Sequence, residues 1–491
     1  MKMKTPFGIV GTLAGSAAAL SLVMVGCGGG DDPPPTPSAL QVLAKDGDVF
    51  PGGFEVGTIE SAEMAEDGTV AIIASERATP SFNGVFLRSP SGDLSEVLGA
   101  DSPLAEGLSF GTVRNLSVAA TGEFAFQVGD QLDQDGLFYW DGSSVSALAR
   151  TAPGQTPDGF RVLGAVRTAG GGDAIFSAGV TPCEVDSTDP NDPEVKCDLN
   201  IYRGTGDTVS RIDVPNTLSA QRPNAVLIEV NSLNEAALGL PARGNEPLVG
   251  RVVNGEFEGL LSRRQDIEGL GILQSARPRA ISDTGAIALD GFIDLDRDGE
   301  RDEEHILLYD RGTLTTIARS GGTFEGNPEV DLRAEGIDGA NRVVYRVEFE
   351  SEAAGGEELV SLRAWENGST RYIAHEGLRY GEDDKGNERR ILDIEQVRVG
   401  ANGDVLMVCR LGREDPETGD RRISGTALLR WNGSSLATVL ELGALVNGKE
   451  LVSQISIADV NANGDLLLIS SLDRSAIRVL LFLPRSAGSV S

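Results

Sequence analysis

The chain has 491 residues, enough for two or three ordinary domains or for one large repetitive domain. Acidic residues outnumber basic ones by 74 to 42, and the resulting net charge of −32 repels nucleic acids and anionic lipid surfaces, which argues against both as partners. With 62 glycines, 22 prolines and no long apolar pattern of period 3.6, the composition also argues against a helical fold.

Residues 1–26 have the pattern of an export signal. Two lysines in MKMK precede an apolar stretch, and small Gly26 stands directly before Cys27. The motif resembles a bacterial lipobox, in which the cysteine receives a lipid; the alternative is an uncleaved transmembrane helix. Gly28 stands where an Asp would favour retention in the inner membrane, so we expect a cell-envelope lipoprotein of the outer membrane or cell surface.

Residues 27–38 comprise the lipidated cysteine and a segment rich in Gly and Pro. Such a composition is typical of a flexible tether, and its eleven residues after Cys27 span at most about 36–40 Å. We expect the lipid anchor to be the protein's only contact with the membrane.

An eight-residue pattern, here called the octet, recurs eight times after the tether. Its fourth residue is Gly or Asn and its last two residues are apolar. The octets start 54, 50, 62, 51, 56, 62 and 61 residues apart and occupy residues 65–72, 119–126, 169–176, 231–238, 282–289, 338–345, 400–407 and 461–468. A repeat of this length indicates a repetitive architecture.

Each octet lies within a unit of four predicted strands. An apolar run leads into the octet, a second strand leaves it, and a third ends at Asp-Gly, Asn-Gly or Arg-Gly before the fourth, a signal for two-residue hairpins. Trp140, Trp365 and Trp431 recur at the end of the third strand, where we expect them to pack. The pattern predicts an all-β fold, a single β-propeller with eight blades, or seven as the runner-up; an open β-solenoid is the other alternative.

The two ends of the repeat region complement each other. The last unit stops one strand short, and residues 39–53 match the missing fourth strand and the linker after it. An N-terminal strand that completes the last blade would close the ring and remove exposed sheet edges. We therefore predict one propeller over residues 39–485, followed by a short tail, 486–491.

The octets resemble the NxxGxxAF tandem repeat of bacterial surface proteins with varied anchors. Asn231 and Asn461 keep the first Asn, and Gly122 with Ala125 and Phe126 keeps the GxxAF half. The resemblance extends over residues 39–484. It implies an exported, anchored repeat protein and no established chemistry.

Three cysteines follow the tether. Cys183 and Cys197 bracket VDSTDPNDPEVK, an acidic loop with two prolines. Because an exported chain is in an oxidising compartment, we predict a disulfide between them. Cys409 lies within an apolar run and is predicted to be a buried thiol.

DLDRDGERDEE, residues 294–304, has the spacing of a calcium loop. Asp294, Asp296 and Asp298 stand at positions one, three and five, and Gly299 follows at six. The loop resembles the DxDxDGxxD loops of other calcium-binding repeat proteins. It predicts a structural calcium ion whose remaining ligands are the backbone carbonyl of Glu300 and the carboxylate of Asp302, because calcium prefers six to eight oxygen ligands. A solvated acidic hairpin is the alternative.

The long segments between predicted strands fall on one face of the expected ring. In a propeller, the loops from second to third strand and the linkers between blades share a face, and here they are the long ones. Loops on a rigid frame usually carry function, so we predict a monomeric binding or scaffolding module for an envelope or extracellular ligand, a glycan or a protein. Tolerated insertions are the alternative.

Catalytic motifs are sparse in this sequence. GLSFG matches the nucleophile elbow by letter, but Ser109 precedes a predicted strand instead of a helix. With only His305 and His375 in the chain, a serine triad has few candidates for its base. We therefore predict no catalytic residue.

The alternative function is a propeller enzyme, a hydrolase, lyase or lactonase-like protein acting on a carbohydrate or lactone. A metal-dependent enzyme of this kind would need carboxylates from several inner strands to converge. Those strands carry Glu63, Glu229 and Asp459, but also Arg167 and Arg398 at the same offset from the octet. Mixed charges favour mutual neutralisation over metal binding.

Overall fold

The computed structural model describes residues 40–485, except 81–82, 100–112, 130–134, 151–159, 181–183, 187–193, 197–198, 206–207, 215–225, 241–245, 325, 352–356, 383–385, 415–420 and 473–476. These described residues contain no helix long and apolar enough to cross a membrane. The predicted leader, the tether and Ser109 lie outside the described residues.

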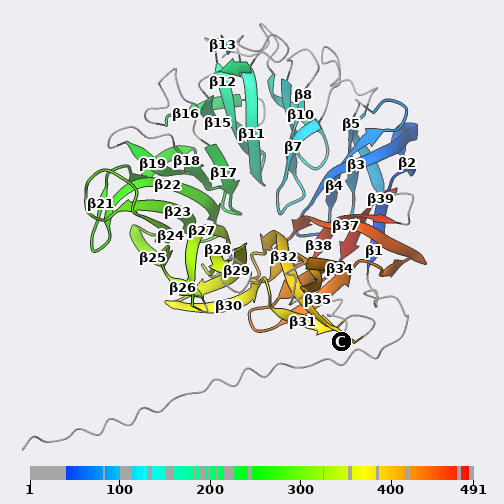
Figure 1. Ribbon diagram of the computed structural model, residues 1–491. Coiled ribbons are helices and arrows are strands. Elements are labelled where there is room, and N and C mark those ends of the chain that lie inside the picture. The colour runs from blue at the N-terminus through cyan, green and yellow to red at the C-terminus, as the bar shows by residue number, and fades with distance from the viewer. Residues whose placement is uncertain are drawn as a thin grey trace, which may run out of the picture.

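Eight four-stranded antiparallel sheets form a ring (Figure 1). The first four blades, from inner to outer strand, are β3 (Phe54–Met64), β4 (Val70–Glu76), β5 (Asn83–Arg88), β6 (Leu94–Leu98); β7 (Val113–Val118), β8 (Phe124–Gly129), β9 (Asp135–Trp140), β10 (Val145–Arg150); β11 (Phe160–Gly170), β12 (Asp173–Val180), β15 (Leu199–Thr205), β16 (Thr208–Ile212); and β17 (Val226–Val230), β18 (Ala236–Gly239), β19 (Pro247–Val253), β20 (Glu256–Ser262).

The other four blades follow the same order. They are β22 (Gly271–Ile281), β23 (Ile287–Asp294), β24 (Glu303–Asp310), β25 (Thr313–Arg319); β27 (Asn327–Ile337), β28 (Val343–Ser351), β29 (Glu357–Glu366), β30 (Ser369–His375); β32 (Glu388–Val399), β33 (Val405–Glu414), β34 (Arg421–Trp431), β35 (Leu436–Glu441); and β37 (Lys449–Val460), β38 (Leu466–Leu472), β39 (Ile477–Leu483), β1 (Gln41–Lys45). The prediction of an eight-bladed propeller is confirmed.

Short strands extend several blades. Five of them lie in linkers and pair with the next inner strand: β2 (Val49–Phe50), β21 (Asp266–Ile267), β26 (Thr323–Phe324), β31 (Arg379–Glu382) and β36 (Leu445–Val446). A 3-10 turn, Pro51–Gly53, follows β2. β13 (Glu184–Asp186) and β14 (Glu194–Lys196) pair with each other between β12 and β15.

Each octet forms the turn between the first and second strands of a blade. Its fourth residue has a positive φ in all eight cases: Gly68, Gly122, Gly172, Asn234, Gly285, Asn341, Gly403 and Gly464. A three-residue hairpin loop ends on such a left-handed residue, and Gly and Asn adopt this conformation at the lowest cost. The Gly or Asn at the fourth position of the repeat is therefore explained by the turn conformation that it must adopt.

The hairpins between third and fourth strands differ in part from the prediction. Asn254-Gly255, Arg311-Gly312 and Asn367-Gly368 form the expected two-residue turns, with both residues at positive φ. Asp141 and Asn432 instead begin four-residue loops, because each side-chain Oδ1 accepts N–H groups from the two serines that end the loop. Arg203-Gly204 was predicted as a turn and lies inside β15.

The N-terminal strand closes the ring as predicted. β1 pairs antiparallel with β39, from Gln41 opposite Phe482 to Lys45 opposite Val479, and becomes the outer strand of the last blade. The amide of Asp46 extends the ladder to the carbonyl of Arg478 at 3.0 Å. The chain ends thus share one blade, and β39 has no exposed edge along this ladder.

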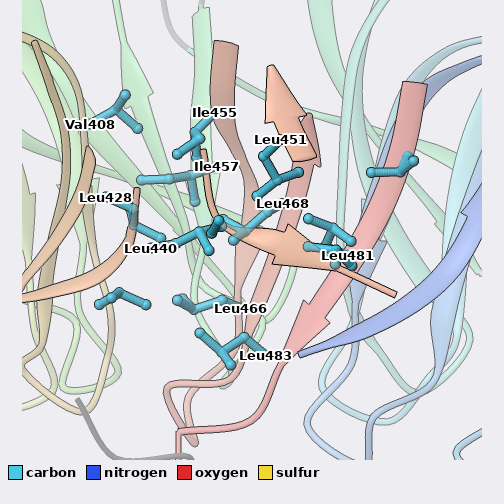
Figure 2. Packing of buried hydrophobic residues seen from close by; sticks show 14 of the residues in the cluster. Val408, Leu428, Leu440, Leu451, Ile455, Ile457, Leu466, Leu468, Leu481 and Leu483 are labelled. Atoms are coloured by element: carbon cyan, nitrogen blue, oxygen red, sulfur yellow. The ribbon is translucent and has the colours of Figure 1, made fainter. Parts of the chain in front are cut away.

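Apolar cores lie between neighbouring blades. In the largest, Val408, Leu428 and Leu440 of the seventh blade meet Leu466 and Leu468 of the eighth (Figure 2). The tryptophans have the predicted packing role: Trp431 is buried between blades, and Trp140 and Trp365 pack at the edge of similar clusters. This repeated packing fixes each blade against the next.

The alternation of strand direction gives the ring two distinct faces. We call the face with the octets and the hairpins between third and fourth strands the turn face. We call the face with the connections from second to third strand and the linkers between blades the loop face. The predicted calcium loop and the Cys183–Cys197 segment both belong to the loop face.

Candidate functional site

The predicted calcium loop connects β23 to β24 in the fifth blade. It brings together carboxylate oxygens of Asp294, Asp296 and Asp302, all within 4.8 Å of one another. Asp294 ends β23 and is buried, whereas Asp296 and Asp302 are exposed. The cluster is therefore fixed at one end by the sheet and open at the other to solvent.

Backbone amides of the loop fold around these carboxylates. Asp294 accepts the N–H of Arg297 at 2.6 Å on Oδ1 and that of Gly299 at 2.9 Å on Oδ2. Asp302 Oδ2 accepts the N–H of Leu295 at 2.6 Å. Positive φ angles at Arg297 and Gly299 permit this tight bend. Each carboxylate oxygen has two lone pairs, so Asp294 Oδ1, which accepts from Arg297, keeps capacity for a cation.

A glutamine that the sequence did not single out supports the buried end of the loop. Gln274 on β22 donates from Nε2 to Asp294 Oδ2 at 2.9 Å. Desolvation raises the pKa of Asp294, but the hydrogen bonds from Gly299, Gln274 and Arg297 outweigh it and hold this pKa below the usual value. Asp294 is thus kept ionised, as a cation ligand must be.

The structure does not bring the predicted ligand Asp298 into this group of three carboxylates. Asp298 Oδ1 accepts the N–H of Glu300 at 2.8 Å, and its carboxylate is not part of the three-residue group. Glu300 was predicted to act through its carbonyl. The all-oxygen donor set of Asp294, Asp296 and Asp302 fits a hard cation such as calcium.

Charged residues on the inner strands hold neighbouring blades together. Two residues before an octet, Glu63 accepts the N–H of Val118 in the next blade at 2.9 Å. Asp459 accepts that of Met64 at 2.7 Å across the closure of the ring, and Glu229 accepts that of Ile281 at 3.3 Å. Among the described residues these three carboxylates do not form a metal-binding group. Their visible role is structural.

Burial raises the pKa of all three carboxyls, Glu63, Glu229 and Asp459. Desolvation, with the nearby charge of Asp459, raises the pKa of Glu63 to about 8. Arg167 and Arg398, the two predicted positive charges of the inner strands, each donate to the carbonyl of the preceding residue. Arg398 is exposed although it is on an innermost strand, so it faces solvent inside the ring.

The remaining cysteines and histidines have separate locations. Cys183 and Cys197 lie outside the described residues and directly flank the strands β13 and β14. Cys409 is a free buried thiol on β33, where burial raises its pKa. His305, on β24, is buried beside Glu303, and His375 ends β30 in the next blade.

Strand order and closure define the protein as an eight-bladed β-propeller with an acidic cluster on one face. No protein-family model matches the sequence, and no curated protein matches it.

Solved propellers are similar to it at 7–10% sequence identity. The β-propeller domain of the Trilobed protease from Pyrococcus furiosus, which has an open velcro topology, is 10% identical, with a TM-score of 0.38 over 79% of this chain and 96% of that one. The WD40 domain of SCAP from fission yeast is also 10% identical, with a TM-score of 0.39 over 91% and 97% of the two chains. The polysaccharide lyase Uly1 is 7% identical, with a TM-score of 0.38 over 86% and 89%. The fold assignment itself follows from the strand pairing.

Proposed function

We propose that the protein is a lipid-anchored propeller of the cell envelope that binds a glycan or protein ligand through its loop face. The unequal elaboration of the two faces carries this proposal. The octets and hairpins of the turn face are short, whereas the loop face holds the segments 181–198 and 295–302 and five linker strands. Binding proteins commonly carry their binding residues on long loops that a rigid scaffold positions on one face.

The ligand can be sought with the chain that begins at Gly28, which lacks the leader and Cys27. We expect a specific glycan on an array, or a protein in an envelope extract, to bind it. Replacing residues 181–198 by a short turn should remove that binding. A matched change on the turn face, shortening the loop 141–144 to Asn-Gly, should leave it intact. Equal binding by both variants would exclude segment 181–198 as the binding site.

Lipid anchoring is tested separately. In cells, a clickable fatty acid should label the full chain, and Cys27→Ala should abolish the label and release the protein into the soluble fraction. Labelling that persists in this variant would contradict attachment at Cys27.

We also propose that a structural calcium ion binds Asp294, Asp296 and Asp302, with Gln274 orienting the buried carboxylate. Calcium would neutralise a group of three converging negative charges and tie the loop to β23. Its place between strands of one blade supports a structural role. The carbonyl of Glu300 remains a proposed further ligand.

Calcium should therefore raise the melting temperature of the native chain. Asp296→Ala should abolish that shift, while Asp298→Ala should keep most of it, because the Asp298 carboxylate is not part of the group. Differential scanning fluorimetry and titration calorimetry measure both effects. An unchanged melting temperature together with no heat of binding would exclude the ion.

A further inference from the structure

The chain enters the propeller on the turn face. Gln41, the first residue of β1, lies opposite Phe482 near the end of β39, and β39 runs from the loop face to the turn face. Arg485, just after β39, contacts two octet acids: its amide donates to Asp465 at 2.9 Å and its Nε lies 3.1 Å from Asp404. The proposed tether therefore joins the ring on the side away from the long loops.

The tether is too short to allow free reorientation. Its eleven residues span at most about 36–40 Å when fully extended. To bring the loop face to the bilayer, the tether must first run along the height of the last blade, where β39 has seven residues and spans roughly 23 Å. That path extends more than half of the chain segment and costs conformational entropy. With the turn face toward the lipid, no such extension is needed.

Charge favours the same orientation. The loop segments 181–198 and 294–304 together hold 13 acidic and three basic residues. Several octet acids on the turn face are instead paired with arginines: Asp338 with Arg342, Glu235 with Arg251, Asp173 with Arg203 and Asp404 with Arg485. An anionic bilayer repels the excess negative charge of these loop segments more strongly than the locally neutralised pairs of the turn face, within a Debye length of about 8–10 Å.

We propose that the tether holds the turn face against the lipid bilayer and directs the loop face away from it. The proposal rests on the N-terminal anchorage of the proposed function and adds which surface is available to a ligand. Ligands that approach from the aqueous side then meet the loop face first.

The orientation can be measured without depending on cellular lipidation. A hexahistidine tag in place of residues 1–27 attaches the chain to vesicles of phosphatidylcholine with anionic and nickel-chelating lipid. Single fluorophores are placed at Leu233→Cys on the turn face or Glu268→Cys on the loop face, in a Cys183→Ser, Cys197→Ser background; buried Cys409 stays unlabelled. Both positions are exposed and lie about opposite the anchored blade, so they form a matched pair.

Energy transfer to an acceptor lipid should be several-fold greater from position 233 than from position 268. Inserting a long Gly/Ser segment into the tether should remove the difference, because the ring can then turn over. Equal transfer with the native tether, or greater transfer from position 268, would overturn the proposal. Since the tag replaces the lipid, this outcome is independent of whether Cys27 is lipidated in cells.

Discussion

The first residue of the octet connects one blade to the next. Asn461 accepts the N–H of Asp465 at 2.9 Å on Oδ1, which closes its own turn, and donates from Nδ2 to the carbonyl of Ala65 at 3.3 Å. Asn231 repeats both contacts toward Glu235 and Ser282. The asparagine of the repeat thus serves a turn and an interface at once, which explains why this side chain suits the position.

We expect Asn461→Ala to lower the free energy of unfolding by about 1–2 kcal/mol, because buried N–H and carbonyl groups lose their partners. Asn461→Ser should cost less, since Ser282 occupies the same position and accepts the N–H of Ala286 through Oγ. Chemical denaturation of the native chain and the two variants measures these free energies of unfolding. Equal losses for both variants would show that the turn acceptor contributes nothing.

Glu63 gives the protein a dependence of stability on pH. Its pKa in the folded state is about 8, above the ordinary value of 4.5 for a glutamate, so folding favours the protonated carboxyl. The stabilisation is complete below the unfolded pKa and is lost as the pH rises from about 4.5 through 8. Glu63→Gln keeps an acceptor for the N–H of Val118 without ionising.

We therefore expect the Glu63→Gln variant to match the native chain at pH 5 and to melt a few degrees higher at pH 9. Glu66→Gln, an exposed change on the turn face, is the control and should leave the profile unaltered. Parallel pH profiles of the Glu63→Gln variant and the native chain would contradict the role of this carboxyl.

At the scale of the element, the β13–β14 hairpin bears on the predicted disulfide. Glu184 pairs with Lys196, and the two cysteines adjoin this pair in the sequence. In the unlipidated chain from Gly28, a thiol reagent should find no reactive cysteine in the native protein and one, Cys409, after denaturation without reductant. Reduction should lower stability by about 3 kcal/mol, as expected for a loop of this length. Three reactive thiols in the oxidised denatured sample would rule out the bond.

The octets made the blade count and the first turn of every blade predictable, because a left-handed residue is visible as Gly or Asn. The hairpins were predictable only where two residues at positive φ complete the turn, as in Asn367-Gly368 and Arg311-Gly312. In DGSS and NGSS, the serines after the turn let Asp141 and Asn432 close a longer loop.

Gln274 could not be predicted as part of the calcium loop. It is 20 residues from Asp294 in the chain, and the pairing of β22 with β23 shifts register beside it, between Leu273 and Ser275. Inner strands carry such shifts repeatedly, so alternation in the sequence does not say which side chain faces inward. For the same reason, the sequence did not predict the hydrogen bond between Glu63 and the N–H of Val118 in the next blade.

At the scale of the whole molecule, ring closure depends on β1. Deleting residues 39–50 should remove the β1–β39 ladder and expose β39 as an unpaired edge, so we expect aggregation or loss of cooperative folding. Deleting residues 28–38 is the matched control and should leave folding unchanged. Size-exclusion chromatography and thermal melting compare the two. A monomeric 39–50 deletion with the native melting temperature would show that the strand is dispensable.

The position of β1 also has a mechanical consequence. The first residue of β1, Gln41, lies on the turn face, and the segment 28–38 precedes this end of the strand in the sequence. Tension on that segment acts along β1 and loads the hydrogen bonds to β39 in shear, so that they bear the force together. A strand pulled sideways from its ladder would instead lose these bonds one after another. The attachment that closes the ring is therefore loaded in its stronger direction when the N-terminus is pulled away from the turn face.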